Sequence, residues 1–268
     1  MNKLPAFPGF ETIWLESCSS TNTVASHWLR ETDNSAGAVI MAGEQTAARG
    51  RLGRSWRTVA GQDLAFSWAW KFGNSCHLAA IQSESTALNM ALAMEIRLGL
   101  MDILRKSDSK DSASILIKWP NDWVVWAQTE FRKVGGMLIE PQWSGAHLRG
   151  WVIGIGINVN ARHLHRPHRG ISLMEATGTS FSVKEVAQVL GNRLVQRFDT
   201  VEREGILSDE ILAAYHQVLA FVGVERDYKF HGETIRAELI EIHLDGTASF
   251  LFNGSVCRWS SSDIQGML

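Results

Sequence analysis

The segment of this sequence with the clearest capacity for chemistry is RGRLGRSW, residues 49–56, in which arginines are spaced by glycines and followed by tryptophan. Glycine lets a backbone approach a ligand closely, and guanidinium groups with backbone N–H groups suit phosphate. The indole of Trp56 can stack on a purine. Arginine–glycine loops bind many anions, so the segment alone is equally typical of a solvated basic loop or an RNA-binding loop.

A second segment, KWPND (residues 118–122), places polar groups directly after an expected strand. Pro120 forces a turn from which Asn121 and Asp122 project. An amide can bind a base or ribose, and a carboxylate can hold Mg²⁺. Because Pro-Asn-Asp is also ordinary turn chemistry, this pentapeptide is a weak signal in isolation.

Two further segments combine strands with glycines. KVGGMLIE (residues 133–140) begins with a lysine that could face a carboxylate or a phosphate, although a surface lysine before a β-bulge is the plainer interpretation. IGIGINVN (residues 153–160) has glycines inside a strand, where they often mark the close approach of a ligand. It is not a dinucleotide-binding fingerprint, because no helix follows directly.

Taken in order, five motifs resemble the biotin–protein ligases: SSTN (19–22), EQTAARGRLGRSW (44–56), KWPND, KVGGMLIE and GIGIN (154–158). Their spacing matches that family too, except for a slightly long hairpin between Asp122 and Lys133. The resemblance covers about residues 11–160 strongly, and the C-terminal region resembles the family's small SH3-like domain more loosely. Each motif alone is weak, but five in order make a specific signal.

The resemblance implies a two-step reaction. The carboxylate of biotin attacks the α-phosphate of Mg-ATP and gives biotinyl-AMP and pyrophosphate. One lysine of a biotin carboxyl carrier domain, part of acetyl-CoA carboxylase or a similar carboxylase, then attacks this mixed anhydride. ATP with Mg²⁺ and biotin would be substrates, and no tightly bound metal is expected.

The resemblance also implies residue roles. Catalytic roles fall to Lys133 and Arg51, and a Mg²⁺ or nucleotide-side role to Asp122. Nucleotide contacts match Arg51, Arg54, Trp56, Asn121, Lys133 and Asn158. Biotin contacts match Ser20, Thr21, Asn22, Gln45, Arg49, Gly50, Arg51, Lys133, Gly136, Gly154 and Gly156.

One position departs from the family, which usually carries glycine where this chain has Ala48. Alanine at positive φ would cost roughly 1 kcal/mol or more. Since Gly50 and Gly53 remain to supply flexible points, we predict that Ala48 adopts an ordinary negative φ.

The elements that must position these residues follow from periodicity. Alternating or buried apolar runs predict strands, and apolar residues at helical spacing predict helices. Expected strands are 11–17, 37–43, 64–70 (half-buried), 115–119, 123–126, 133–140 and 150–159. Expected helices begin at Ser20 or Thr21, at about Leu88 (ending near Lys106), at Val183 and at Ser208.

After Val222 the pattern changes to short strands, with hairpin turns at Asp245-Gly246 and Asn253-Gly254. Together with the resemblance, this predicts an α+β fold. A mixed-sheet catalytic domain flanked by helices, of the class II synthetase-like biotin–lipoate ligase type, would span residues 1–221. An SH3-like β-barrel would span residues 222–268.

Composition sets the class of protein. The 268 residues include 45% hydrophobic and 20% charged residues, with a formal net charge of -2, which is ordinary globular composition and argues against a dedicated nucleic-acid binder. The three cysteines are widely spaced, so no disulfide framework or zinc site is expected. No apolar run of about 18 residues and no signal-peptide core is present, which favours a cytoplasmic protein without a membrane partner.

Several features favour the plainer interpretation. The histidines of HLHRPHR (His163, His165 and His168) lack a nearby carboxylate and are interpreted as part of a solvated loop. Cys18 is expected to be a small buried residue. The eleven tryptophans predict an aromatic core.

Two other functions remain as alternatives to a biotin–protein ligase. A lipoate–protein ligase or transferase would share the fold, but the glycine-rich histidine motif that resembles those enzymes is absent. An RNA- or nucleotide-binding module would use the arginine loop but leave KWPND, Lys133 and GIGIN unexplained. About ten residues precede the first expected strand, too few for the DNA-binding module of some family members, so DNA binding is not expected. The sequence leaves monomer or homodimer open.

Overall fold

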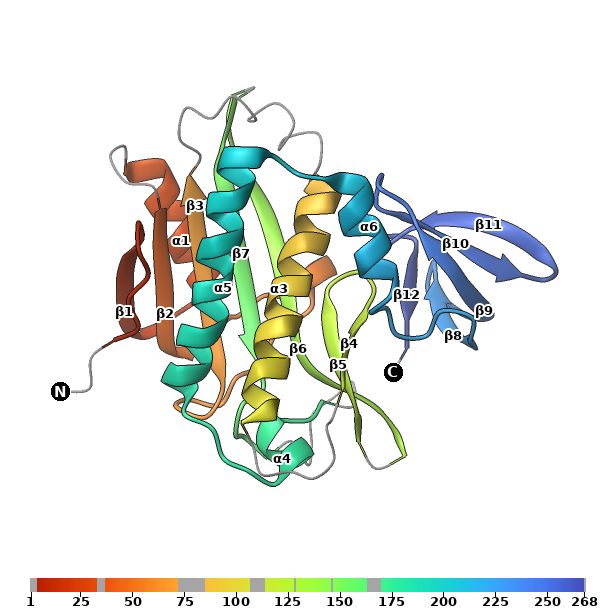
Figure 1. Cartoon of the computed structure of the whole chain (residues 1–268), viewed down its shortest axis with the longest axis horizontal. Helices are drawn as coiled ribbons and strands as arrows, with labels where there is room; N and C mark the ends of the chain where they lie inside the picture. Colours follow the sequence, from red (N-terminus) through yellow and green to blue (C-terminus); the bar gives the residue numbers. More distant parts are fainter. Residues whose placement is uncertain are drawn as a thin grey trace.

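A mixed sheet carries most of the predicted site residues (Figure 1). The computed structural model describes residues 4–32, 37–71, 85–106, 114–127, 129–145, 147–162 and 170–267. Within them, the sheet runs in the order β1-β2-β3-β7-β6-β5-β4, with β1 and β2 parallel and the other neighbours antiparallel. Its strands are β1 (Glu11–Cys18), β2 (Gly37–Gln45), β3 (Leu64–Lys71), β4 (Ile115–Lys118), β5 (Asp122–Ala127), β6 (Glu130–Ser144) and β7 (His147–Ile157).

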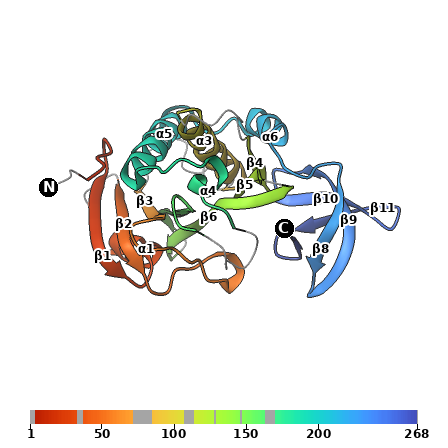
Figure 2. The same cartoon turned by 90° about the horizontal axis from the view of Figure 1, so that it is seen from below.

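Helices cover both faces of this sheet (Figure 2). On one face lie α3 (Ser85–Arg105), α5 (Val183–Glu204) and α6 (Ser208–His216). On the other face, α1 (Thr21–Glu31) packs against β2, β3 and β7. The predicted α+β class and the long predicted helices are thus confirmed.

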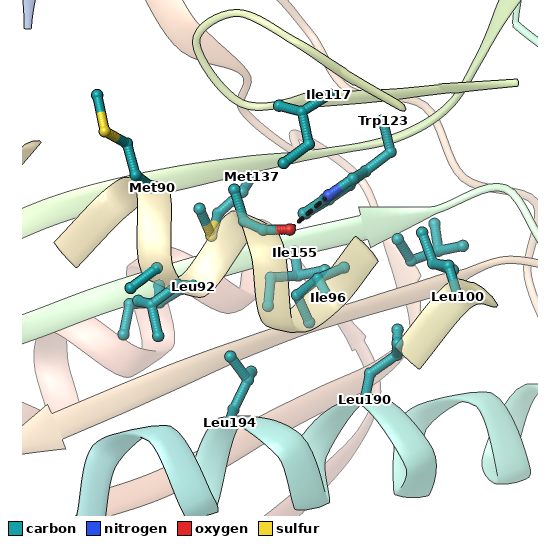
Figure 3. Packing of buried hydrophobic residues seen from close by; sticks show 14 of the residues in the cluster. Met90, Leu92, Ile96, Leu100, Ile117, Trp123, Met137, Ile155, Leu190 and Leu194 are labelled. Carbon is teal, nitrogen blue, oxygen red and sulfur yellow. Dashed lines mark hydrogen bonds between the residues drawn. The ribbon is translucent and has the colours of Figure 1, made fainter. Parts of the chain in front are cut away.

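The main core lies between the sheet and the pair α3 and α5 (Figure 3). Leu92, Ile96 and Leu100 of α3 are fully buried and follow the 3.6-residue period that predicted this helix. The indole N–H of Trp123 in β5 donates to the backbone oxygen of Ala93 at 2.9 Å, which satisfies a buried donor inside the core. Trp68 and Trp70 are also fully buried, as the aromatic-core prediction required, whereas Trp126 and Trp143 are more than half exposed.

Strand β3 differs from its prediction as a half-buried strand. Every residue from Leu64 to Trp70 is buried. The physical reason is that α1 covers one face of this central strand while α5 contacts the other. The small residues that alternate with the aromatic ones lie under a helix instead of facing solvent.

The C-terminal segment forms a second, antiparallel sheet in the order β11-β10-β9-β8-β12. Its strands are β8 (Glu225–Phe230), β9 (Glu233–Ile242), β10 (Thr247–Phe252), β11 (Ser255–Ser260) and β12 (Ile264–Gly266). Both predicted turns connect strands, with Gly246 at φ 84° and Asn253 at φ 50°. Phe250 of this sheet lies edge-on to Trp119 at 6.2 Å between ring centroids, so the C-terminal sheet makes apolar contact with the turn that follows β4. The domain boundary at residue 221 stays a prediction.

Within the described ranges, the sequence did not predict the α-helix that follows β7. The short α4 (Leu173–Thr177) begins with a capping box in which Ser172 and Glu175 bond each other's backbone N–H groups. The predicted loop histidines 163, 165 and 168 lie outside the described residues. None of the helices in the described ranges is long and apolar enough to cross a membrane.

Candidate active site

A cavity of about 640 Å³ opens where the large sheet meets the C-terminal sheet. This volume lies within the usual range for sites that bind small molecules. The cavity is lined by all the predicted site residues: Ser20, Thr21, Asn22, Gln45, Arg49, Gly50, Arg51, Arg54, Trp56, Asn121, Asp122, Lys133, Gly136, Gly154, Gly156 and Asn158. Segments as distant as residues 20 and 158 therefore meet at one site.

One end of the cavity holds a cluster of hydroxyl and amide groups, bordered by the ion pair of Arg49 and Glu140. Ser67 of β3 is fully buried, and its hydroxyl lies 2.7 Å from Thr21 Oγ1 and 2.6 Å from Asn22 Oδ1. The backbone N–H of Thr21 donates to Gln45 Oε1 at 2.8 Å, and Asn22 Nδ2 donates to Glu140 Oε2 at 2.6 Å. Buried hydroxyl and amide groups of this kind match a neutral polar ligand group better than an ion.

Ser20 adds to this end of the cavity. It is the N-cap residue of α1, yet its side chain makes no capping hydrogen bond. The residue is 3% exposed and lines the cavity. A serine at this position normally bonds a backbone N–H of the first turn. Its hydroxyl is therefore available to a ligand at the start of α1.

The glycines of β7 make room for two of these side chains. A Cβ at Gly154 would overlap the side-chain amide of Asn22, and a Cβ at Gly156 would overlap the indole of Trp56. Glycine is required at both positions because the side chains lie directly on the strand backbone. The indole N–H of Trp56 is buried and has no hydrogen-bond partner among the described residues.

Backbone hydrogen bonds join the two ends of the arginine loop (residues 48–56), which lies between β2 and β3. Trp56 N–H donates to Ala48 oxygen at 2.9 Å and Gly50 N–H to Arg54 oxygen at 2.7 Å. Ala48 is absent from the residues at positive φ, so its predicted conformation is confirmed. At the tip, Leu52 adopts φ 55° and is 53% exposed, so a non-glycine residue occupies the left-handed conformation there.

Four charged groups meet near the middle of the cavity. Lys133 Nζ lies 2.6 Å from Asp122 Oδ1, and Lys118 Nζ lies 3.8 Å from Asp122 Oδ2. Burial would raise the pKa of Asp122, but Lys133, Lys118 and Arg51 hold it below its ordinary value. Burial lowers the pKa of Arg51, although Asp122 opposes that shift. The carboxylate therefore stays ionised among three cations, a surplus of positive charge that suits an anionic ligand.

Gly136 and the ring of Trp56 border this charged centre. A Cβ at Gly136 would lie 2.9 Å from Asp122 Oδ1 and 3.2 Å from Lys133 Nζ, so glycine keeps space for the ion pair. Lys133 Nζ also lies 5.0 Å from the centroid of the Trp56 ring, within range of a cation–π contact. The ammonium group is thus held between a carboxylate and an aromatic ring.

The Mg²⁺ role of Asp122 stays a prediction. In the described part of the chain, no group of three or more histidine, cysteine or acidic side chains is placed to hold a metal. Both carboxylate oxygens of Asp122 face lysines. This donor set does not fit a resident metal ion.

The two asparagines predicted as nucleotide contacts have structural partners. The side-chain amide of Asn121 donates to the backbone oxygen of Met137. The side-chain amide of Asn158 donates to the backbone oxygens of Lys133, at 3.1 Å, and Ile171, at 3.2 Å. Both residues line the cavity, but these bonds make them supports of β6, the strand that carries Lys133. Their contact with a nucleotide stays a prediction.

The prediction did not include several residues that complete the site. Lys118 and Glu140 lie inside the quoted motifs, so their charge was a signal that could have found them. The hydroxyl of Tyr215 in α6 donates to the backbone oxygen of Pro120 at 2.8 Å and so supports the turn of KWPND. Three further lining residues from the C-terminal sheet, with no motif to mark them, are Lys229, Ser261 and Gln265.

Comparisons with known proteins agree on one relationship. Residues 14–158 match the model of the Biotin/lipoate A/B protein ligase family. The chain is 26% identical over 226 residues to the bifunctional ligase/repressor BirA of Bacillus spizizenii, covering 84% of this chain and 57% of that protein. It is 35% identical over 125 residues to a biotin–[acetyl-CoA-carboxylase] ligase of Paracoccus denitrificans, covering 47% of this chain and 45% of that protein. These matches span about half the length of the curated relatives.

A solved structure shares the fold over nearly the whole chain. The biotin protein ligase from Aquifex aeolicus in complex with biotin and ATP superposes with a TM-score of 0.70 at 24% identity, covering 95% of this chain and 97% of that one. At this identity the likeness establishes the fold.

Proposed function

The chain belongs to the Biotin/lipoate A/B protein ligase family, and on that premise we propose that it is an ATP-dependent biotin–protein ligase. It activates biotin to biotinyl-5'-AMP with release of pyrophosphate. It then transfers biotin to a lysine of a biotin carboxyl carrier domain. The names of its relatives, a biotin–[acetyl-CoA-carboxylase] ligase among them, support this choice of substrate and acceptor.

The observation that carries the proposal is the division of one cavity into a neutral polar end and a cationic centre. Hydroxyl and amide groups of Ser20, Thr21 and Asn22 suit the ureido ring of biotin, which is polar but uncharged. The glycines of β7 form the floor between that end and Trp56. A ligand with a neutral ring, an apolar tail and a terminal carboxylate fits this sequence of environments.

The cationic centre suits the first chemical step. A carboxylate oxygen of biotin forms a bond to the α-phosphorus of ATP, and the bond from that phosphorus to the bridging oxygen of pyrophosphate breaks. Attack of one anion on another is slowed by charge repulsion, which Lys133 and Arg51 reduce at the developing charge. Mg²⁺ accompanies ATP as part of the substrate. Trp56 lines the cavity and offers an aromatic surface to the nucleotide side.

In the second step, the uncharged amine of the acceptor lysine attacks the carbonyl carbon of biotinyl-AMP. The bond from that carbon to the phosphate oxygen breaks, AMP leaves, and the attacking nitrogen loses a proton to solvent. The same two cations hold the phosphate of the departing AMP. The protein forms no covalent intermediate, because the mixed anhydride already carries the activated carbonyl. The arginine loop contributes by keeping the anhydride in the cavity until the acceptor arrives.

A lipoate ligase is the second candidate because the same family model includes such enzymes. Lipoate has no ureido ring, so it would add fewer hydrogen bonds to the hydroxyl and amide groups at this end, which already bond one another. Each hydrogen bond that biotin makes and lipoate lacks favours biotin by about 0.5–1.5 kcal/mol. The polar cluster around Ser67 therefore favours biotin.

Biotin-dependent exchange of labelled pyrophosphate into ATP tests this proposal. We expect exchange with biotin and Mg-ATP, and less than about one hundredth of that rate when lipoate replaces biotin. A protein that shows no exchange with biotin, or equal exchange with both acids, would not be a biotin ligase.

A further inference from the structure

The C-terminal sheet touches the arginine loop through one side-chain pair. Nη2 of Arg51, at the tip of the loop, donates to Oγ of Ser261 at 2.5 Å, across 210 residues of sequence. Ser261 follows β11 and belongs to the turn that leads into β12. Both residues line the cavity. Figure 2 shows the loop (orange) reaching from the large sheet toward the C-terminal strands.

The turn that carries Ser261 is fixed by its own hydrogen bonds. The backbone N–H and the hydroxyl of Ser260 both bond Asp263 Oδ2, at 3.0 and 2.6 Å. The hydroxyls of Ser260 and Ser262 lie 2.6 Å apart. Ser262 is exposed and points to its own turn, whereas Ser261 is half-buried against the loop. Ser261 therefore presents its hydroxyl from a rigid support.

The loop needs such a support at its tip. Its base is closed by the backbone bonds between Ala48, Gly50, Arg54 and Trp56, but the residues beyond them include Leu52 in a left-handed conformation. A leucine at φ 55° costs about 1 kcal/mol relative to an ordinary conformation. A tip that is locally unfavourable keeps its position only when an outside contact fixes it.

We propose that Ser261 is a positioning residue that latches the arginine loop over the cavity by holding Arg51. This inference rests on the proposed function and deepens it, because the C-terminal sheet would then control how long the activated acid stays in the site. Arg51 faces the reacting groups, and Ser261 acts only through Arg51. Loss of the latch would shorten retention of biotinyl-AMP, because Arg51 would no longer be fixed over the cavity.

The structural half of this proposal is tested without any substrate. We compare hydrogen–deuterium exchange in peptides that cover residues 48–57 for the ligand-free wild type, Ser261→Ala, Ser261→Thr and the matched control Ser262→Ala. Exchange should be several-fold faster in Ser261→Ala alone, while peptides of β10 and β11 remain unchanged. Loop exchange in Ser261→Ala equal to wild type overturns the latch, whatever the enzyme does.

The functional half is tested by the release of labelled biotinyl-AMP after rapid removal of free substrates. Release should be about tenfold faster in Ser261→Ala, and close to wild type in Ser261→Thr and Ser262→Ala. In an Arg51→Ala background, Ser261→Ala should add nothing, because the latch has lost its partner. Multiplicative effects of the two substitutions, or unchanged release from Ser261→Ala, overturn the inference. A wild type whose loop exchange depends on Ser261 but that forms no adenylate would instead refute the proposed function.

Discussion

Oδ1 of Asp122 lies 2.6 Å from Nζ of Lys133, and the pair joins neighbouring strands at the floor of the cavity. In the ligand-free protein, the carboxylate of Asp122 neutralises the positive charge of the Lys133 ammonium group. Lys118 approaches the other oxygen of the same carboxylate. This arrangement lets Lys133 face an anionic substrate without leaving either charge of the ligand-free protein unpaired in a largely buried place.

Removing the ammonium group tests its role in the first step. We expect Lys133→Ala to lower the rate of adenylate formation by at least about 100-fold, the loss seen when one group that stabilises developing charge is deleted. The fold should persist because Asp122 keeps Lys118 as a partner. Single-turnover formation of biotinyl-AMP measures the effect, with circular dichroism as a check of folding. Arg132→Ala, on the same strand but outside the cavity lining, is the matched control and should retain activity. Near-normal adenylation by folded Lys133→Ala would exclude this lysine from the reaction.

Substitutions at the two glycines of β7 should affect the two substrates differently, because Gly154 lies beside Asn22 and Gly156 lies beside Trp56. A Cβ at Gly154 would displace Asn22, so Gly154→Ala should raise KM for biotin at least about tenfold and leave KM for ATP within about twofold. A Cβ at Gly156 would displace Trp56, so Gly156→Ala should raise KM for ATP instead. Steady-state kinetics with each substrate varied gives both values. The same effect of both substitutions on both constants would contradict the assigned orientation.

We expect Lys118 to lower the free energy of unfolding of the protein but to increase the rate of adenylation. Its side chain is 13% exposed, and burial lowers its pKa below the ordinary 10.5. The unfolded chain therefore binds the extra proton between the folded pKa and 10.5, so wild-type stability gains with rising pH in that window. We expect Lys118→Met to raise the free energy of unfolding by about 1 kcal/mol at pH 7 and to slow adenylation.

Urea denaturation of wild type and Lys118→Met at a series of pH values measures this difference. The advantage of the variant should be complete below the folded pKa and should shrink as pH rises toward 10.5. Lys106→Met, at an exposed lysine after α3, is the control and should show no such trend. A variant less stable than wild type at pH 7 would mean that the pair with Asp122 outweighs the burial of the ammonium group.

Tyr215 should support the turn of KWPND through its hydroxyl. Pro120 oxygen accepts from this hydroxyl at 2.8 Å and from Asn89 Nδ2 at 3.3 Å. Tyr215→Phe should lower the free energy of unfolding by about 1 kcal/mol. The double variant Tyr215→Phe/Asn89→Ala should lose more than the sum of the single losses, because the carbonyl then lacks both donors. Thermal unfolding of all four proteins provides the cycle, and strict additivity would show that the two donors act independently.

Local sequence patterns predicted most of the framework: helices α1, α3, α5 and α6 bury a face that repeats every 3.6 residues, and the strands of the large sheet formed where apolar runs predicted them. The burial of β3 was missed because alternation along a strand does not reveal a second covering helix. Helix α4 was not predicted, although Ser172 and Glu175 have the residue types and spacing of a capping box. The contacts of Tyr215 and Ser261 join residues about 95 and 210 positions apart, and no local pattern encodes such a pairing.

The direct test of the central claim is transfer of label from [α-³²P]ATP to biotin. Purified protein with Mg-ATP and biotin should yield a labelled product identical to biotinyl-AMP, and a biotin carboxyl carrier domain added afterwards should become biotinylated as the label leaves as AMP. Lipoate should give no labelled adenylate, and Lys133→Ala should give little. Absence of labelled biotinyl-AMP from the wild type, or equal labelling of lipoate, would contradict the account.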